Sequence, residues 1–360
     1  MRKIRVGILG ATGMVGQHYV NLLIEHPFFE ISFLAASKDS AGKTYGQALQ
    51  EKGRSFDSIP PSVLAMPVYS VDEIDKAKEH CDFVFSAVNA ETAKINEPLY
   101  AAAGLPVVSN ASAHRMDPDV PLLIPEINPE HLELIHQQRK NRGWGKGFII
   151  AKPNCSVQSY LFPLFPLHQK FGIKKLIITT MQAVSGAGYP GVSSLDIIDN
   201  VIPYIGGEEE KSEREPLKIL GKIQNGKIAP IQGLSISAHC NRVPVMDGHT
   251  ACVSVEFVKK PTKEEILEIW REFRSVPQEL NLPSAPIQPI IYREEKDRPQ
   301  PKFDRNAEGG MAITVGRLRE CPVLDFRFVA LSHNALRGAA GGGVLNAELL
   351  YSQNYFGEHL

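Results

Sequence analysis

A glycine-rich turn near the N-terminus constrains the fold of this chain more than any other feature. The segment Gly7-Ile8-Leu9-Gly10-Ala11-Thr12-Gly13-Met14-Val15-Gly16 follows an apolar run and precedes apolar residues at helical spacing. Glycine permits a tight turn, and the free N–H groups and dipole at the start of the helix attract an anion. Strand, glycine turn and helix in this order predict a dinucleotide-binding unit. The alternative is close helix–strand packing without a ligand.

The order of the apolar segments predicts two domains, as does the length of 360 residues. Strands expected near 4–9, 31–35, 82–86 and 105–109 alternate with helices, which indicates a doubly wound parallel sheet. After residue 151 the expected strands are longer and follow one another, at 176–184, 234–243, 250–258, 311–318 and 323–331. They predict a largely antiparallel sheet with helices on one face. We therefore expect an α/β protein with a Rossmann-type domain at 1–152 and an α+β domain at 153–333.

Composition excludes several classes of function. With 43% hydrophobic and 22% charged residues and a net charge of -1, the chain gives no reason to expect nucleic acid or an anionic membrane as partner. No apolar run is long enough to span a bilayer, and the first strand leaves no room for a signal peptide. The five cysteines are scattered and form no CxxC pair, so we expect reduced thiols in the cytoplasm and no metal site.

The end of the second strand distinguishes the two nicotinamide cofactors. An acidic residue there would bind a free ribose 2′-hydroxyl, but the chain has Ser37 and Lys38. A hydroxyl and a cation favour a 2′-phosphate, and therefore NADP over NAD. An ordinary solvated loop would have the same composition.

Cys155 is the candidate nucleophile. It lies in Lys152-Pro153-Asn154-Cys155-Ser156, directly before apolar residues at helical spacing. A thiol in the first turn of a helix feels the positive end of the helix dipole, which predicts a lowered pKa. The free N–H groups of that turn, with Asn154, are suited to bind an oxyanion. A small buried core cysteine is the alternative.

A second element carries candidate catalytic groups on either side of a turn. The segment from Asn241 to Thr250 is expected to end one strand, turn at Asp247-Gly248 and begin the next, which would bring Arg242 and His249 together. A guanidinium binds a carboxylate through two hydrogen bonds, and an imidazole transfers protons at neutral pH. A surface histidine after a turn is the alternative.

Four motifs occur in one order behind the glycine turn. They are Pro153-Asn154-Cys155, the segment Gln182-Ala183-Val184-Ser185-Gly186, Arg242-Val243-Pro244 with Gly248-His249, and His333-Asn334-Ala335-Leu336-Arg337-Gly338. Over its whole length the chain resembles aspartate-semialdehyde dehydrogenases of the archaeal and fungal branch. The resemblance implies a second domain of the glyceraldehyde-3-phosphate dehydrogenase-like kind that serves catalysis and dimerisation.

The resemblance also implies the reaction and its catalytic residues. Cys155 would attack the acyl phosphate of L-aspartyl 4-phosphate, and NADPH would reduce the resulting thioester to L-aspartate 4-semialdehyde, a precursor of lysine, threonine and methionine. His249 would act as acid and base, and Gln182 would orient the substrate. The resemblance implies that the binding partners are small-molecule substrates, aspartyl phosphate and phosphate. It also implies a homodimer or homotetramer.

Substrate and cofactor contacts are implied in the same way. Arg242 would hold the substrate carboxylate, Glu208 its ammonium, and Lys211 and Arg115 its phosphate, although Glu208-Glu209-Glu210-Lys211 also resembles a solvated charge run. The implied cofactor contacts are Gly10, Thr12, Gly13, Met14 and Val15 for the pyrophosphate, Ser37, Lys38 and Ser40 for the 2′-phosphate, and Ser185, Gly186 and Asn334 near the nicotinamide. The C-terminal helix within 334–360 would return to the first domain.

Three other interpretations remain open at this stage. Malonyl-CoA reductase uses the same scaffold, a cysteine thioester and NADPH, but it needs no partner for an ammonium such as Glu208. N-acetyl-glutamyl-phosphate reductase fits the surroundings of Gln182 and Arg242 less well. A catalytically silent NADP-binding protein would not need the combination of Cys155 and His249.

Overall fold

The first domain is built on a parallel sheet whose first strand in sequence ends at the glycine turn. A computed structural model describes residues 3–54 and 58–357. The six strands lie in the order β3 (Val68–Ser70), β2 (Phe29–Ala36), β1 (Ile4–Leu9), β4 (Phe83–Ser86), β5 (Val107–Ser109) and β6 (Ile149–Ala151). All pairs are parallel. The strand order reverses at β1, so the carboxyl ends of β1 and β4 flank a crevice where ligands bind in such sheets.

Helices connect these strands as the alternating pattern predicts. They are α1 (Met14–Leu23), α2 (Tyr45–Glu51), α3 (Pro61–Leu64), α4 (Ile74–His80), α5 (Ala90–Ala102) and α6 (Leu134–Arg142). Helix α1 begins directly after the glycine turn and buries Tyr19, Val20 and Leu23 against the sheet. The sequence-based prediction of a Rossmann-type domain is confirmed.

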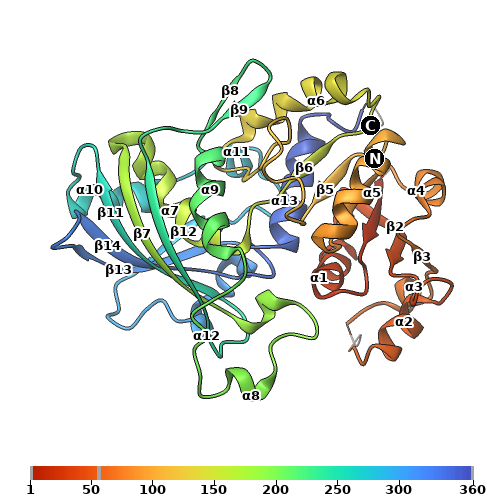
Figure 1. Ribbon diagram of the computed structural model, residues 1–360, viewed down its shortest axis with the longest axis horizontal. Helices are drawn as coiled ribbons and strands as arrows, with labels where there is room; N and C mark the ends of the chain where they lie inside the picture. Colours follow the sequence, from red (N-terminus) through yellow and green to blue (C-terminus); the bar gives the residue numbers. More distant parts are fainter. Residues whose placement is uncertain (1–2, 55–57, 358–360) are drawn as a thin grey trace.

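The second domain is a mixed six-stranded sheet beside the first (Figure 1). Its order is β10 (Ser235–Arg242), β7 (Ile173–Gln182), β11 (His249–Phe257), β14 (Phe326–Ser332), β13 (Ile313–Glu320) and β12 (Ile290–Arg293). The pairs β10–β7 and β12–β13 are parallel and the other three are antiparallel. The expected hairpin at Asp247-Gly248 is wrong: β10 and β11 both pair with β7, so the connection passes over the end of that strand.

Helices cover one face of this sheet. Helix α7 (Cys155–Phe171) packs on β7, β11 and β14, while α9 (Glu208–Ile219) packs on β10 and α10 (Lys263–Glu272) on β12. Residues along β11 alternate between buried and more exposed positions, and Cys252 is exposed on the face away from α7. Short elements complete the domain: α8 (Ser194–Ile197), β8 (Lys222–Gln224), β9 (Lys227–Ala229), α11 (Val276–Glu279) and α12 (Pro301–Asp304).

The last helix, α13 (Ala340–Ser352), lies against α1 and β5 of the first sheet. Within the predicted segment 334–360 the helix begins only at Ala340, because residues 334–339 form turns. Gly343 explains the close approach, since a Cβ there would lie 1.9 Å from the hydroxyl of Tyr19. Residues 358–360 of the predicted segment lie outside the described residues. Among the helices that the structure describes, none has the length and apolar character of a membrane span.

Candidate active site

The ends of three neighbouring strands bring the predicted catalytic side chains together. Gln182 is the last residue of β7 and pairs in register with Arg242, the last residue of the parallel strand β10. His249 is the first residue of β11, which runs antiparallel to β7, so it lies at the same edge. Helix α7 packs on this sheet and places Cys155, its first residue, beside that edge. Arg242 and His249 are therefore brought together by the order of the strands in the sheet, and not by the hairpin that was expected.

Cys155 and His249 are in direct contact, with 3.2 Å between Sγ and Nε2. The other ring nitrogen, Nδ1, accepts a hydrogen bond of 3.1 Å from the backbone N–H of Ala183. Burial, and then the charge of Arg242, lower the pKa of His249 to about 3. The ring is therefore neutral at pH 7, and because Nδ1 accepts, its single hydrogen is on Nε2 and points at the sulfur.

The pKa of the thiol differs from the sequence-based prediction. Burial, and then the negative charge of Glu208, raise the pKa of Cys155 to about 11, while the cations Lys152, Arg115 and Arg242 lower it in part. The prediction of a lowered pKa is wrong, because loss of solvent outweighs the helix dipole at this position. How readily the sulfur ionises therefore depends on the charged groups around it.

Glu208 is a buried acceptor at the start of α9. Both of its carboxylate oxygens accept hydrogen bonds of 2.9 Å from Nδ2 of Asn154, and one accepts from Nε2 of Gln182 at 3.2 Å. Nζ of Lys211 donates to it at 2.8 Å. Burial alone would raise the pKa of Glu208, but Lys211 and the two amides hold it below its usual value. The amide of Asn154 is thus committed to Glu208, so the expectation that it serves an oxyanion is not supported.

Arg115 lies in the same pocket and is held by a carboxylate that the sequence analysis missed. Its Nη1 donates to Glu215 at 2.9 Å, and Nη2 donates to the carbonyl of Asn110 at 3.0 Å. The second oxygen of Glu215 accepts a hydrogen bond of 2.6 Å from the backbone N–H of Asn154, the N-cap of α7. Glu215 follows Glu208 by seven residues, the spacing that places both on one face of a helix, and that signal was available in the sequence.

Arg242 and Gly186 lie close together beside His249. Nη1 of Arg242 donates to the carbonyl of Ala183 at 2.7 Å, and that is the only hydrogen bond of this guanidinium among the described residues. A Cβ at Gly186 would lie 2.8 Å from Nη1 of Arg242 and 2.9 Å from the ring of His249, so a larger residue would displace both. The free edge of the guanidinium can bind a carboxylate.

Most of these side chains line one cavity of about 690 Å³, a size typical of small-molecule sites, whereas His249 and Glu215 are buried and are not part of its lining. The predicted residues on its wall are Met14, Val15, Arg115, Cys155, Gln182, Ser185, Gly186, Glu208, Lys211, Arg242 and Asn334. Asn334 is hydrogen-bonded on both sides, from Nδ2 to Ser185 at 2.8 Å and from the N–H of Gly248 to its oxygen at 2.8 Å. Asn334 therefore connects the turns before α13 to Ser185 and to Gly248, the residue before β11.

Comparisons with known proteins agree with this geometry. Residues 5–135 match the NAD binding domain of semialdehyde dehydrogenase and residues 164–337 match its dimerisation domain. Aspartate-semialdehyde dehydrogenase of Methanothermobacter thermautotrophicus is 48% identical over 96% of this chain and 99% of its own, and that of Schizosaccharomyces pombe is 46% identical over 96% and 97%. The chain belongs to the aspartate-semialdehyde dehydrogenase family. The Candida albicans enzyme, solved with NADP, superposes with a TM-score of 0.88 at 42% identity, covering 98% of this chain and 99% of its own.

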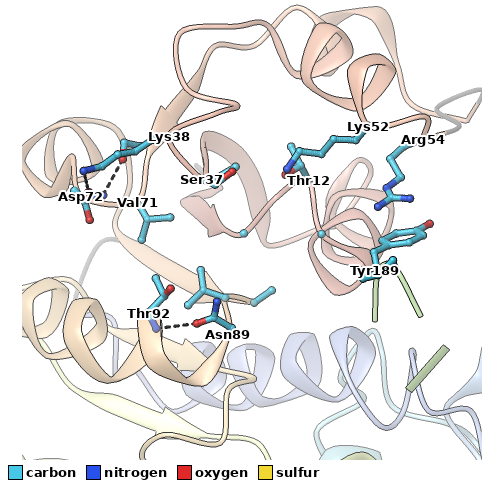
Figure 2. A pocket seen from close by; sticks show the side chains of 17 residues that line it. Thr12, Ser37, Lys38, Lys52, Arg54, Val71, Asp72, Asn89, Thr92 and Tyr189 are labelled. Atoms are coloured by element: carbon cyan, nitrogen blue, oxygen red, sulfur yellow. Dashed lines mark hydrogen bonds and ion pairs between the residues drawn. The ribbon is translucent and has the colours of Figure 1, made fainter. Parts of the chain in front are cut away.

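The cofactor groove expected of this family joins the active-site cavity. A second cavity of about 580 Å³ is lined by Gly10, Thr12, Gly13, Ser37 and Lys38, all predicted from the sequence. Its lining shares Ala87, Val88, Asn89 and Tyr189 with the cavity that holds Cys155. Figure 2 shows Ser37 between two groups of charged side chains on this groove. A dinucleotide lying along β1 and α1 can therefore reach the thiol.

Two further cations that the sequence analysis missed lie on this groove. Nζ of Lys52 contacts the hydroxyl of Thr12 at 3.2 Å, and the guanidinium of Arg54 lies 3.0 Å from the ring centre of Tyr189 (Figure 2). Neither cation forms an ion pair within residues 3–54 and 58–357, and the buried Nε of Arg54 has no hydrogen-bond partner there. Unpaired cations beside a glycine turn fit the phosphates of a dinucleotide. No periodic pattern in the sequence marks either residue.

The predicted contacts with the 2′-phosphate differ in how well they fit. Ser37 and Lys38 both line the groove, although Lys38 also pairs with Asp72 at 3.4 Å. Ser40 is 2% exposed and is not part of the lining, so the structure does not support it as a cofactor contact. Its hydroxyl is buried, and the residue lies in a turn in which its N–H donates to the carbonyl of Ser37.

Proposed function

We propose that this chain reduces L-aspartyl 4-phosphate to L-aspartate 4-semialdehyde with NADPH through a thioester on Cys155. The observation that carries this proposal is the contact of 3.2 Å between His249 and Cys155, which lines a cavity that shares part of its wall with the dinucleotide groove. The names of the relatives and the presence of NADP in the Candida albicans structure support it.

The charged residues of the cavity match the groups of this substrate. Arg242 would bind the α-carboxylate through the free edge of its guanidinium, and Glu208 would accept hydrogen bonds from the ammonium. Arg115 and Lys211 would bind the phosphate. Since each cation is now paired with Glu215 or Glu208, binding would exchange these pairs for contacts with substrate.

In this proposal His249 donates a hydrogen bond from Nε2 to the reacting oxygen, and Gln182 orients the reacting group. The thiolate of Cys155 attacks the acyl carbon, the C–O bond to phosphate breaks, and phosphate leaves with the bonding electrons. NADPH supplies the hydride that reduces the thioester. The hydrogen on Nε2 of His249 stabilises the oxygen that becomes negative, and when the C–S bond breaks, the sulfur returns as thiolate with the semialdehyde released.

For the cofactor we propose NADP, held by the N-terminal turn and by cations near the ribose. Met14 and Val15 open α1 and line the active-site cavity, and Gly10, Thr12 and Gly13, which precede them, line the cofactor groove. Ser37 and Lys38 would receive the 2′-phosphate, with Lys52 and Arg54 as additional cations. Ser185, Gly186 and Asn334 would contact the nicotinamide end.

The domain limits and the assembly are proposals as well. We propose a cofactor domain of residues 1–152 and a catalytic domain of 153–333, with the C-terminal segment packed on the first. The match to a dimerisation domain indicates a homo-oligomer. We propose that the sheet face with Ile177 and Cys252, both exposed, forms part of the interface of a dimer or tetramer in the cytoplasm.

The decisive experiment runs the reaction in the oxidative direction. Purified protein with aspartate semialdehyde, phosphate and NADP should form NADPH, and arsenate should replace phosphate. The variant Cys155→Ser should lose this activity while it still binds NADPH, which shows that the fold is retained. Turnover of malonyl-CoA without turnover of the semialdehyde would assign the other substrate, and near-normal activity of Cys155→Ser would exclude the thioester.

A further inference from the structure

Lys218 is a buried lysine near the end of α9 that holds a loop of the first domain. It is 3% exposed, and its Nζ donates to the carbonyls of Arg115 at 2.6 Å, Asp117 at 2.6 Å and Val120 at 2.8 Å. Within residues 3–54 and 58–357, Lys218 is the only hydrogen-bond donor to the carbonyls of Arg115 and Val120. An ammonium group has three hydrogens, so each of them has one carbonyl acceptor.

The ammonium form of Lys218 is present at neutral pH although the group is buried. Burial lowers its pKa to about 8, and the carboxylates of Asp117, Asp119 and Glu215 act against this change. At pH 7 most molecules therefore carry the third hydrogen, which a neutral amine would lack. All three carbonyls of the loop thus have a donor.

One face of α9 carries four charged residues at intervals of three and four, which are Glu208, Lys211, Glu215 and Lys218. The first two line the active-site cavity. The last two hold Arg115, because Glu215 accepts from its guanidinium and Lys218 donates to its carbonyl. A single helix therefore fixes Arg115 at its side chain and at its backbone, and it also carries Lys211 to the same cavity.

Arg142 of α6 holds another part of this loop. Its guanidinium donates to the carboxylates of Asp117 and Asp119, at distances between 2.6 and 3.1 Å. These contacts do not involve the backbone of Arg115. The N–H of Arg115 donates to the carbonyl of Ser112 at 3.3 Å, which is a bond within the loop itself. Lys218 is thus the contact by which the second domain holds the main chain at Arg115.

We propose that Lys218 is a positioning residue that fixes Arg115 for binding of the substrate phosphate. Arg115 and Lys211 line the same cavity and are the proposed ligands of that phosphate. Because α9 carries Lys211 and holds the backbone of Arg115 through Lys218, the helix sets the separation of the two cations. Hydrogen bonds to a ligand weaken steeply when a donor is displaced. The inference rests on the proposed function, since it takes phosphate as the ligand of Arg115.

The test is the KM of phosphate in the oxidative reaction with aspartate semialdehyde and NADP. Lys218→Met removes all three hydrogens, and it should raise this KM about fivefold, the scale on which members of one hydrogen-bond network affect one another. Lys218 lines neither cavity, so the KM of NADP and kcat at saturating phosphate should stay at their wild-type values. Arg214→Met is the matched control, because it removes an exposed cation of the same helix and should leave the KM of phosphate unchanged.

A double-mutant cycle shows whether Lys218 acts through Arg115. Arg115→Met alone should raise the KM of phosphate at least about tenfold, the value of one charge-assisted hydrogen bond. In the Arg115→Met background, Lys218→Met should then add nothing, because the side chain that it positions is gone. A further rise in that background, as large as in wild type, would overturn the proposal, since Lys218 would then act by another route.

Folding is checked in every variant by NADPH binding and by the thermal midpoint. Lys218→Gln keeps two of the three hydrogens, so it carries the test if Lys218→Met does not bind NADPH. A wild-type KM of phosphate in both Lys218 variants would overturn the proposal and leave the role of Arg115 intact. So would a KM of NADP that rises as much as that of phosphate, because that result indicates a general loss of structure. An unchanged KM in Arg115→Met would instead remove Arg115 from the phosphate site, and the proposal with it.

Discussion

Glu215 offers the sharpest test of how the active site is held together. This carboxylate is 2% exposed and accepts from Nη1 of Arg115 at 2.9 Å and from the N–H of Asn154 at 2.6 Å. Replacement Glu215→Gln keeps the size of the side chain but removes its charge. The amide oxygen can accept from one of the two donors, while its NH₂ group faces the other.

The magnitude follows from these two contacts. One buried donor loses its acceptor, which costs about 1–3 kcal/mol. If that donor is Arg115, its charge is left without a partner, and breaking a buried ion pair in this way costs about 3–5 kcal/mol. We therefore expect Glu215→Gln to lower the free energy of unfolding by about 3 kcal/mol, the value at which the two ranges meet.

Urea unfolding followed by fluorescence measures this change. Glu210→Gln is the matched control, because Glu210 is on the same helix, has the same charge and is exposed. A double-mutant cycle with Arg115→Met isolates the ion pair from the contact to Asn154. The free energy of unfolding of Glu215→Gln could instead fall by less than about 1 kcal/mol, as in the control. That result would show that this carboxylate does not neutralise Arg115 in a buried site.

Three further predictions test the proposed roles of other residues. His249→Asn should lower kcat about a hundredfold, the scale of losing one hydrogen-bond donor to a developing oxyanion. The pKa of His249 is about 3 in the native state and near 6.5 in the unfolded chain, so acid favours the unfolded chain. When the pH falls from 7 to 5, the free energy of unfolding of wild type should therefore fall by about 2 kcal/mol more than that of His249→Asn. Equal losses in urea unfolding would contradict that pKa. Arg242→Lys should raise KM for the semialdehyde more than it lowers kcat, since lysine cannot make two parallel hydrogen bonds, and an unchanged KM would remove Arg242 from the substrate site. Arg54→Ala should weaken NADPH binding at least about tenfold, the value of one charge-assisted contact, measured by fluorescence titration; wild-type affinity would show that this cation does not bind the cofactor.

Much of the fold was predictable because it depends on local patterns. The glycine turn between β1 and α1 and the alternation of strands and helices over the first domain depend on short segments, and the structure has them where they were expected. The cysteine at the start of α7 was predictable for the same reason, since an Asn N-cap and the following apolar spacing define a helix start.

The candidate site was predictable to the extent that each residue belongs to a motif. Cys155, Gln182, Arg242 and His249 lie in short recognisable segments, and the sheet brings their strand ends together. Lys52 and Arg54 belong to no motif and became visible only through the cavity that they line.

Some features follow from tertiary structure alone. The position of β7 between β10 and β11 depends on pairing across many residues, which a turn signal at Asp247-Gly248 cannot specify. The raised pKa of Cys155 reflects how much solvent the surrounding elements exclude, and burial is a property of the whole fold. The sequence by itself determined the βα unit, the candidate nucleophile and its motif. Tertiary structure decided which charges surround the sulfur, because electrostatic interactions depend on distances that only packing sets.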